Sequence, residues 1–466
     1  MKLRRCVLPL FVTALALLPS TAAAQIAAQP IAQTATQPPA SPDERDVSWG
    51  SPIDRDDDFV RTPDTVRISR PELFPRLKAY LRDLPPFFRD TSLTLRSRTF
   101  YFNQQSGNGT ASEALATGGW LQYASGWLFD TFAVGATYYT SWPLYAPDCC
   151  PGSLLLTSPG NDVIGVFGEA WGALRYKDYA LLKGFRQRVD DGYVNPQDNR
   201  MVPNTFEGVT LSGKLDWAKY DLGYLTQIKP RDSNDFIPMS RQAGASGDGK
   251  GLILSSVTLT PIKGLSLYGS NFYGLDTFNT AFGKAEYDHT LSNELKLQFG
   301  LQGTDQRSVG EQRVGNFATW NVGAGMRVSW RGLSMGAATH FTGADASISS
   351  PWGTWPGYLS LLVTDFDRAN EKAFGVGVKY DFGGSLLPFR IPGLTVQLLY
   401  GQGSDRNDPA SGKAQPTTRE GDLDIIYNVP AVRGLSLRFR NGYVGSGNPQ
   451  TLMDFRIIVN YELGLL

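Results

Sequence analysis

The sequence predicts an all-β protein, a transmembrane antiparallel β-barrel of about 18 strands with short periplasmic turns and long external loops, some of them folded into the lumen. Three observations lead to this prediction. From Asp90 onward, apolar and polar residues alternate with period 2. Short connections between these segments alternate with long ones. After residue 24, no stretch approaches the roughly 18 consecutive apolar residues that a transmembrane helix requires.

The composition fits this class and excludes others. The 466 residues carry 44 basic and 44 acidic side chains, so no nucleic-acid partner is expected, because binding to phosphates needs a basic surface. An aromatic content of 12% argues against a disordered chain. After residue 24 the cysteines are the adjacent Cys149 and Cys150, which exclude a disulfide framework. They indicate a vicinal bridge or two loop thiols in preference to a redox role.

The chain divides into three predicted parts. Residues 1–24 read as a signal peptide, with Arg4 and Arg5 before an apolar core and small residues at 22–24 for cleavage. Residues 25–85 are predicted to form a largely irregular N-terminal extension, with one weak helical pattern over 71–84. Residues 86–466 are predicted to form the transmembrane barrel.

The period-2 segments give the predicted strands, because each keeps one apolar face and one polar or small face. Clear examples are residues 93–98, 209–215, 295–301, 374–380 and 435–440. The short connections include 217–220, 261–264, 289–293 and 330–332, and the long ones include 141–162, 189–206, 230–250, 342–368 and 402–420. Trp217, Tyr220 and Trp330 lie at short turns, where an interfacial aromatic belt is expected.

Arginines share one face of the first strand and of the last two strands. Apolar residues such as Leu95 and Leu437 occupy the opposite parity. An arginine that faces lipid at the membrane midplane costs roughly 2–4 kcal/mol, so these side chains are predicted to face the lumen. The first and last strands pair in a closed barrel, which makes the three strands neighbours with one basic wall. The predicted wall consists of Arg96, Arg98, Arg438, Arg440 and Arg456.

Two readings of this wall stay open. In the functional reading, the arginines guide a carboxylate through the lumen, because guanidinium stays charged and binds carboxylate bidentately. Asp422 and Asp424 on the preceding strand then pair with some arginines and orient them. In the alternative reading, the charges solvate the lumen wall and pair with one another.

The motifs of the barrel region together resemble the OprD family of substrate-specific outer-membrane porins. The similarity covers most of residues 85–466 and is carried by residues 88–103, 199–208, 265–270, 378–382, 392–394, 421–427 and 434–441. The resemblance implies an 18-stranded barrel, a monomer or loose homotrimer, and a pore narrowed by the third and seventh external loops. It also implies uptake of small carboxylate-bearing solutes along a ladder of arginines.

The resemblance identifies candidate residues in the two constriction loops. On the strand count, the loops are residues 189–206 and 342–368. Arg188 and Arg200 are candidates to line the constriction, and a loop-anchoring salt bridge is the alternative. Asp345 and Asp365 of the seventh loop could attract a substrate cation. The chain departs from the family pattern at Gln397, where members often carry another arginine.

The sequence therefore predicts a porin for passive, selective diffusion of small solutes across the outer membrane of a Gram-negative bacterium. The expected partners are small carboxylates, the lipid bilayer and lipopolysaccharide. No catalytic residue, cofactor or metal is expected, because the chain has no phosphate loop, dinucleotide fingerprint or zinc spacing. Two alternatives remain: a barrel with hydrolase activity using His289 or His340, and a non-conducting assembly or adhesion barrel.

Overall fold

The computed structural model describes residues 71–466 apart from 292–293 and 448–450. The predicted signal peptide and most of the predicted N-terminal extension lie outside these residues. Among the described residues, no helix is long and apolar enough to cross a membrane. The described residues belong to one compact unit.

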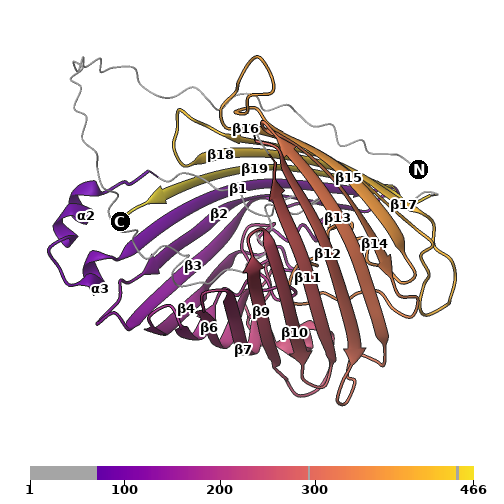
Figure 1. Cartoon of the computed structure of the whole chain (residues 1–466), viewed down its shortest axis with the longest axis horizontal. Helices are drawn as coiled ribbons and strands as arrows, with labels where there is room; N and C mark the ends of the chain where they lie inside the picture. The colour runs from indigo at the N-terminus through magenta and orange to yellow at the C-terminus, as the bar shows by residue number, and fades with distance from the viewer. Residues whose placement is uncertain (1–70, 292–293, 448–450) are drawn as a thin grey trace. The chain divides into compact units, whose positions relative to one another are not determined.

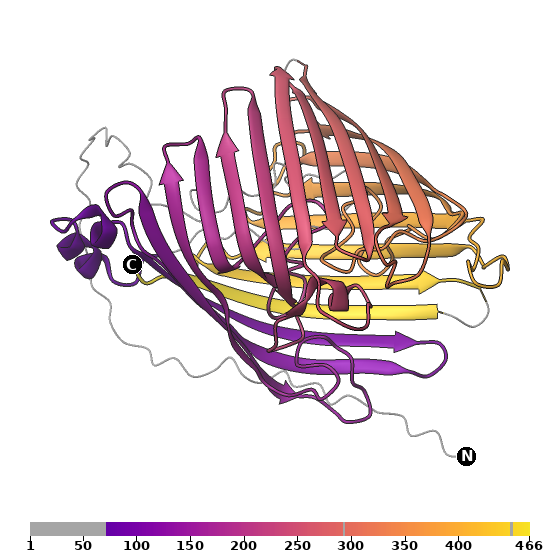
Figure 2. The ribbon, with the colours of Figure 1, turned by 90° about the horizontal axis from the view of Figure 1, so that it is seen from below.

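One antiparallel sheet curls round and closes on itself (Figures 1 and 2). β19 pairs with β1 from Thr94 opposite Gly464 to Ser106 opposite Leu452. The sheet contains 19 strands, of which β8 is a two-residue piece that pairs with the end of β7. Within the described residues, 18 strands therefore make up the barrel wall, as the sequence predicts.

The strands have the following bounds: β1 Ser92–Ser106, β2 Ala111–Ala124, β3 Phe132–Tyr145, β4 Ile164–Tyr176, β5 Ala180–Gln187, β6 Thr205–Lys214, β7 Ala218–Lys229, β8 Ile237–Pro238, β9 Leu252–Ile262, β10 Leu265–Gly274, β11 Phe278–Thr290, β12 Lys296–Ser308, β13 Ala318–Trp330, β14 Leu333–Thr342, β15 Lys372–Asp381, β16 Leu394–Ser404, β17 Thr418–Asn428, β18 Leu435–Gly445 and β19 Thr451–Gly464. The helices are α2 Pro75–Leu81, α3 Pro86–Arg89 and α4 Met239–Gln242.

The two faces of the sheet differ in chemistry because side chains alternate along each strand. On β18, Leu437 is 40% exposed on the outer face, whereas Arg438 is 3% exposed inside. The outer face is apolar, as contact with lipid requires. Trp217 and Trp330 lie exposed at the short-turn end, and Trp142 and Trp320 lie exposed near the other end. These positions fit an aromatic belt at each interface.

The connections differ between the two ends of the barrel. One end carries short turns, such as 177–179, 215–217 and 331–332. The other end carries the long loops, which include loop 2 (146–163), loop 3 (188–204), loop 4 (230–251), loop 7 (343–371) and the connection 405–417. The alternation is less strict than the sequence predicts. The external connections 107–110 and 275–277 are tight turns, because the flanking strands continue to the rim.

Loops 3 and 7 are held inside the barrel by a shared aromatic core. Tyr193 of loop 3 packs with Phe272 and Phe282 of the wall and with Trp352 and Trp355 of loop 7. Trp355 Nε1 donates to Tyr193 Oη at 3.2 Å. The burial of each such ring stabilises the fold by several kcal/mol, in proportion to the apolar area that it removes from water. Figure 2 shows coil segments within the ring of strands.

Loop 3 and loop 7 also share polar contacts through one buried amide. Asn195 Nδ2 donates to the carbonyl of Thr354 at 2.8 Å, and its Oδ1 accepts from the Thr354 N–H at 2.9 Å. Buried polar groups need such partners, and this pair satisfies four of them at once. The two loops therefore behave as one packed unit that blocks part of the lumen.

The segment before β1 contacts the short-turn end of the barrel. Leu73 N donates to Gly464 O at 2.7 Å, and Gly464 N donates to Pro71 O at 2.9 Å. The weak helical pattern over 71–84 corresponds to the shorter helix α2, which begins at Pro75, a residue that favours the first helical turn. α2 and α3 lie beside the start of β1 in Figure 1.

Candidate functional site

The register of the last strands and the first strand arranges the five wall arginines in rows. Arg440 of β18 lies opposite Arg456 of β19. Two residues further along, Arg438 lies opposite Ile458. The next rows hold Arg98 opposite Asn460 and then Arg96 opposite Glu462. Inward residues on a strand are about 7 Å apart, so the arginines descend in steps toward the short-turn end.

Arg438 and Arg440 share one buried carboxylate. Arg438 Nε donates to Asp424 Oδ1 at 2.9 Å, and its Nη2 donates to Asp424 Oδ2 at 2.5 Å. Arg440 Nε lies 3.5 Å from Asp424 Oδ2. The structure thus places Asp424 where the functional reading of the sequence expects an orienting acid. Arg438 is held in a bidentate pair and Arg440 in a longer contact.

Arg456 is positioned by its neighbour on the same face of β19. Its Nε donates to Asp454 Oδ1 at 2.6 Å and its Nη2 donates to Asp454 Oδ2 at 2.9 Å. Gln104 Nε2 donates to the same carboxylate at 2.9 Å. The Arg456 guanidinium also lies 5.4 Å from the centre of the Phe102 ring. The sequence predicts that Asp454 faces the lumen but assigns it no role. Its i, i+2 spacing from Arg456 places both side chains on the same face of β19, which indicates that they can pair.

Arg98 anchors loop 3 to the wall. Its Nε donates to Asn460 Oδ1 at 2.9 Å, and its Nη1 donates to Asp198 Oδ1 at 2.8 Å and to the carbonyl of Arg200. Arg96, one row below, donates to Glu462 through Nε and Nη2 and lies 4.7 Å from the Trp120 ring centre. Arg98 and Asp198 thus form a salt bridge that anchors loop 3 to the wall.

Arg200 reaches from loop 3 toward the wall. Its Nε donates to Ser153 O at 3.1 Å and its Nη1 donates to Asn199 O at 3.0 Å. Its guanidinium lies 4.8 Å from the centre of the Phe102 ring. Burial lowers the pKa of Arg200 well below its usual range, and the positive charges of Arg456, Arg231 and Arg440 add to this effect.

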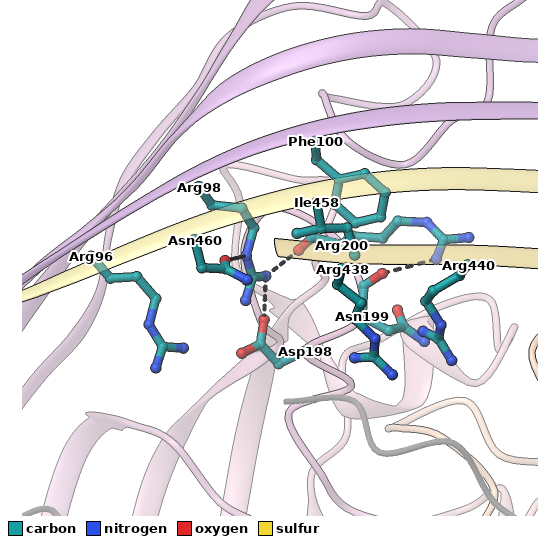
Figure 3. A pocket seen from close by; sticks show the side chains of 10 residues that line it. All are labelled: Arg96, Arg98, Phe100, Asp198, Asn199, Arg200, Arg438, Arg440, Ile458 and Asn460. Carbon is teal, nitrogen blue, oxygen red and sulfur yellow. Dashed lines mark hydrogen bonds and ion pairs between the residues drawn. The ribbon is translucent and has the colours of Figure 1, made fainter. Parts of the chain in front are cut away.

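Two adjoining cavities connect the wall with the loops. The first lies between loop 3 and the wall and is drawn in Figure 3. Its lining includes Arg96, Arg98, Arg200, Arg438 and Arg440, with Asp198 as the acidic residue. The second lies between loops 3 and 7 and has a volume of about 210 Å³. Its lining includes Arg200, Arg231, Arg440 and Arg456, with Asp365 as the acidic residue. Arg200 and Arg440 line both.

Loop 7 is tied to β17 by two carboxylates that the sequence did not assign to this task. Glu420 accepts from the N–H groups of Val363 and Thr364, both at 2.8 Å. Asp422 Oδ2 accepts from the N–H of Leu362 at 3.1 Å. Of the two acids expected to orient the arginines, Asp424 holds Arg438 and Arg440, whereas Asp422 caps the backbone of loop 7. Glu420 lies two residues from Asp422 on β17, so the strand alternation already indicates that both carboxylates face the lumen.

The structure brings some predicted loop residues into the site and leaves others out. Asp365 lines the second cavity and accepts from Ser360 Oγ at 2.5 Å. Asp345 is exposed and lines neither cavity. Arg188, at the start of loop 3, also lines neither. Gln397, the departure from the expected ladder, lies opposite Asp424 in the same row as Arg440 and Arg456.

The two histidines and the two cysteines of the described chain lie outside the arginine-lined cavities. His340 is buried; its Nδ1 lies 2.8 Å from Asn321 Oδ1, and its ring contacts Trp355 edge-on at 5.0 Å. His289 lies near the exposed end of β11. Among the described residues, no group of three or more His, Cys, Asp or Glu side chains could hold a metal ion. In loop 2, Cys149 and Cys150 form a vicinal disulfide.

A closed 18-stranded barrel with an apolar outer face, a charged lumen and internal loops defines an outer-membrane porin. The family model for outer membrane porins of the OprD family matches residues 85–465, and the chain belongs to this family. Porin D of Pseudomonas aeruginosa is 23% identical over 82% of this chain and 92% of its own. The protein is therefore a Gram-negative outer-membrane porin for small solutes, in a family of channels rather than enzymes.

Solved structures share the fold. OccK9 (OpdG) of Pseudomonas aeruginosa has a TM-score of 0.73 at 20% identity and covers 82% of this chain and 100% of its own. OpdK of the same organism, solved with vanillate, has a TM-score of 0.72 at 21% identity, covering 81% and 100%. OccAB2 of Acinetobacter baumannii has a TM-score of 0.72 at 20% identity, covering 82% and 100%.

Proposed function

We propose that this porin mediates passive, selective diffusion of small carboxylate-bearing solutes, guided by inward-facing arginines. The guiding residues are Arg440, Arg456 and Arg200 at the constriction, followed by Arg438. Arg98 and Arg96 shape the passage below them. The transport needs no energy source, because the solute diffuses down its own concentration gradient.

The observation that carries the proposal is the charge of the two cavity linings. The first lining has five arginines and one carboxylate, and the second has four arginines and one carboxylate. A cleft lined by one sign of charge, with low-dielectric walls, raises the local concentration of the opposite charge. Guanidinium groups also match the geometry of a carboxylate, which favours this anion over chloride.

The alternative reading, in which the charges merely pair with one another, accounts for part of the wall. Arg96 and Arg98 have close acidic partners in Glu462 and Asp198. Arg440 differs, since its contact to Asp424 is 3.5 Å long while Arg438 holds the same carboxylate bidentately. Arg440 also lines both cavities. It is therefore the wall residue best placed to meet a solute.

The test is the reversal potential of single channels in planar bilayers under a salt gradient. Arg440→Gln leaves the Arg438–Asp424 pair in place, so folding should be preserved. We expect the ratio of anion to cation permeability to fall roughly fivefold. This change corresponds to about 1 kcal/mol, the energy of two unit charges 4 Å apart in water.

The matched control is Arg307→Gln, which removes the same charge from the outer face of β12, where Arg307 pairs with Asp305. We expect the control to keep the wild-type permeability ratio. The absence of channels would contradict the porin itself. Channels whose selectivity is the same in Arg440→Gln and wild type would contradict the guiding role.

A further inference from the structure

The second cavity carries two arginines that do not come from the strands of the arginine wall. Arg200 belongs to loop 3 and Arg231 lies at the start of loop 4. Arg231 is held toward loop 3, because its backbone N–H donates to Asn204 Oδ1 at 2.8 Å and its Nη1 donates to Asn199 Oδ1. The cavity is thus lined by two arginines from the wall and by two from the loops.

The charge of Arg200 is buried among neutral partners. The residue is 7% exposed. Its hydrogen bonds go to the carbonyls of Ser153 and Asn199, and its ring contact is with Phe102. In the part of the chain that the structure describes, no salt bridge joins Arg200 to a carboxylate. Of the charges that act on Arg200, Asp454 is opposite in sign, while Arg456, Arg231 and Arg440 have the same sign, so an anion at this position would be stabilised.

Arg200 of loop 3 and Arg456 of the wall both lie beside the ring of Phe102. The guanidinium carbons of Arg200 and Arg456 lie 4.8 Å and 5.4 Å from the centre of Phe102. They are therefore at most 10.2 Å apart, the sum of the two distances. Arg456 holds Asp454 through Nε and Nη2, and Arg200 donates Nε and Nη1 to backbone carbonyls, so a carboxylate would meet the other N–H groups of each guanidinium. A small solute with two acidic groups can reach both.

We propose that this constriction selects small solutes with two carboxylates over those with one. One carboxylate meets Arg440 and Arg456 on the wall, and the other meets Arg200 and Arg231 on the loops. The inference rests on the proposed function, because it assumes that the arginine-lined passage admits carboxylates. The other lining side chains are uncharged apart from Asp365, among the residues the structure describes, so the solute between its acidic ends is short and uncharged.

The test is block of the chloride current through single channels of the full-length porin. Succinate and butyrate have the same chain length and differ by one carboxylate, and sulfate is a compact dianion. We expect succinate to reduce the current at a concentration about tenfold lower than butyrate, the ratio that corresponds to one additional charged contact. Sulfate cannot reach both arginine pairs, so it should block less well than succinate.

Three variants separate the roles of charge and of loop position. Arg231→Gln should bring the blocking concentration of succinate toward that of butyrate. Asn199→Ala removes the acceptor that holds the Arg231 guanidinium without removing a charge, and should weaken the preference for succinate less than Arg231→Gln does. Arg241→Gln removes a charge from exposed loop 4 away from both cavities, and should match wild type.

The outcomes distinguish this inference from the proposed function. Equal block by succinate and butyrate in a channel that still prefers anions would overturn the inference and leave the proposed function standing. A channel without anion preference would overturn both. Equal block by sulfate and succinate would overturn the two-position arrangement, and an unchanged preference in Arg231→Gln would remove Arg231 from it.

Discussion

At the residue scale, the arginines inside the barrel differ in what their guanidinium groups hold. Arg98 is bound by Asn460, by Asp198 and by a backbone carbonyl of loop 3. Arg440 lies 3.5 Å from Asp424 and lines both cavities. An inward arginine therefore does not by itself identify a solute contact. The residues divide into those that position loop 3 and those that face the passage.

Replacement of Arg98 tests this division. Arg98→Gln leaves the buried Asp198 without its charge partner, and breaking such a pair costs about 3–5 kcal/mol. We expect loop 3 to loosen, so that single-channel conductance rises and fluctuates more. The permeability ratio should change less than in Arg440→Gln. A quiet channel of wild-type conductance with reduced selectivity would instead assign Arg98 to direct solute contact.

The inward direction of these arginines follows from the sequence, but their partners do not. Leu95 and Arg96 lie on opposite faces of the sheet, and Arg96 faces the lumen because a charged side chain in contact with lipid is destabilising. The partner of Arg98 lies 100 residues away in an irregular loop. No periodicity predicts the backbone of such a loop. Arg231 was missed for the same reason, since it follows a strand end and has no alternation to mark its direction.

At the element scale, loop 7 stays in the lumen through contacts of two kinds. Its aromatic residues Trp352 and Trp355 join the buried cluster on the opposite wall. Its backbone N–H groups at 362–364 are capped by Glu420 and Asp422 of β17. The cluster resists pulling the loop outward, and the caps fix its distance from the arginine wall. The width of the second cavity depends on both.

Removal of one cap should release this part of loop 7. In Glu420→Gln the amide retains a single acceptor oxygen, so one of the N–H groups of Val363 and Thr364 loses its partner. Hydrogen bonds to charged groups contribute roughly 1.5–3 kcal/mol each. We expect more frequent brief changes of current in single-channel recordings, with an unchanged permeability ratio.

The control for this prediction is Glu311→Gln, an exposed acid in the connection 309–317 that pairs with Arg313. It removes the same charge and leaves both caps on residues 362–364 in place, so the recordings should be unchanged. Equal gating frequencies in Glu420→Gln and wild type would show that the aromatic cluster alone holds the loop.

The strands were predictable as elements, and the loop positions were not. Period-2 alternation gives strand number because every barrel strand has one lipid face. The tight external turns at 107–110 and 275–277 escaped prediction, since strand ends near the rim lose the apolar face that marks them. The position of loop 7 depends on tryptophans that pack against β10 and β11, which is a tertiary contact without a local signal.

At the scale of the whole molecule, the two ends of the barrel can be distinguished by accessibility. Lys413 is exposed in the long connection 405–417, and Asp216 is exposed in the turn 215–217 at the opposite end. In a Cys149→Ser/Cys150→Ser background, we expect Lys413→Cys to react with an impermeant thiol reagent on intact cells. Asp216→Cys should react after the outer membrane is permeabilised. The reverse labelling pattern would show that the barrel has the opposite orientation in the membrane.

The arginine wall is built from β1, β18 and β19, the first strand and the last two strands of the chain. Its rows exist because β19 pairs with β1, so they are absent from any open sheet that precedes this pairing. Loop 3 likewise obtains its anchor from Arg98 on β1 and Asn460 on β19. The proposed discrimination between solutes would therefore arise only when this seam closes, and a sheet that stays open between β1 and β19 would lack it.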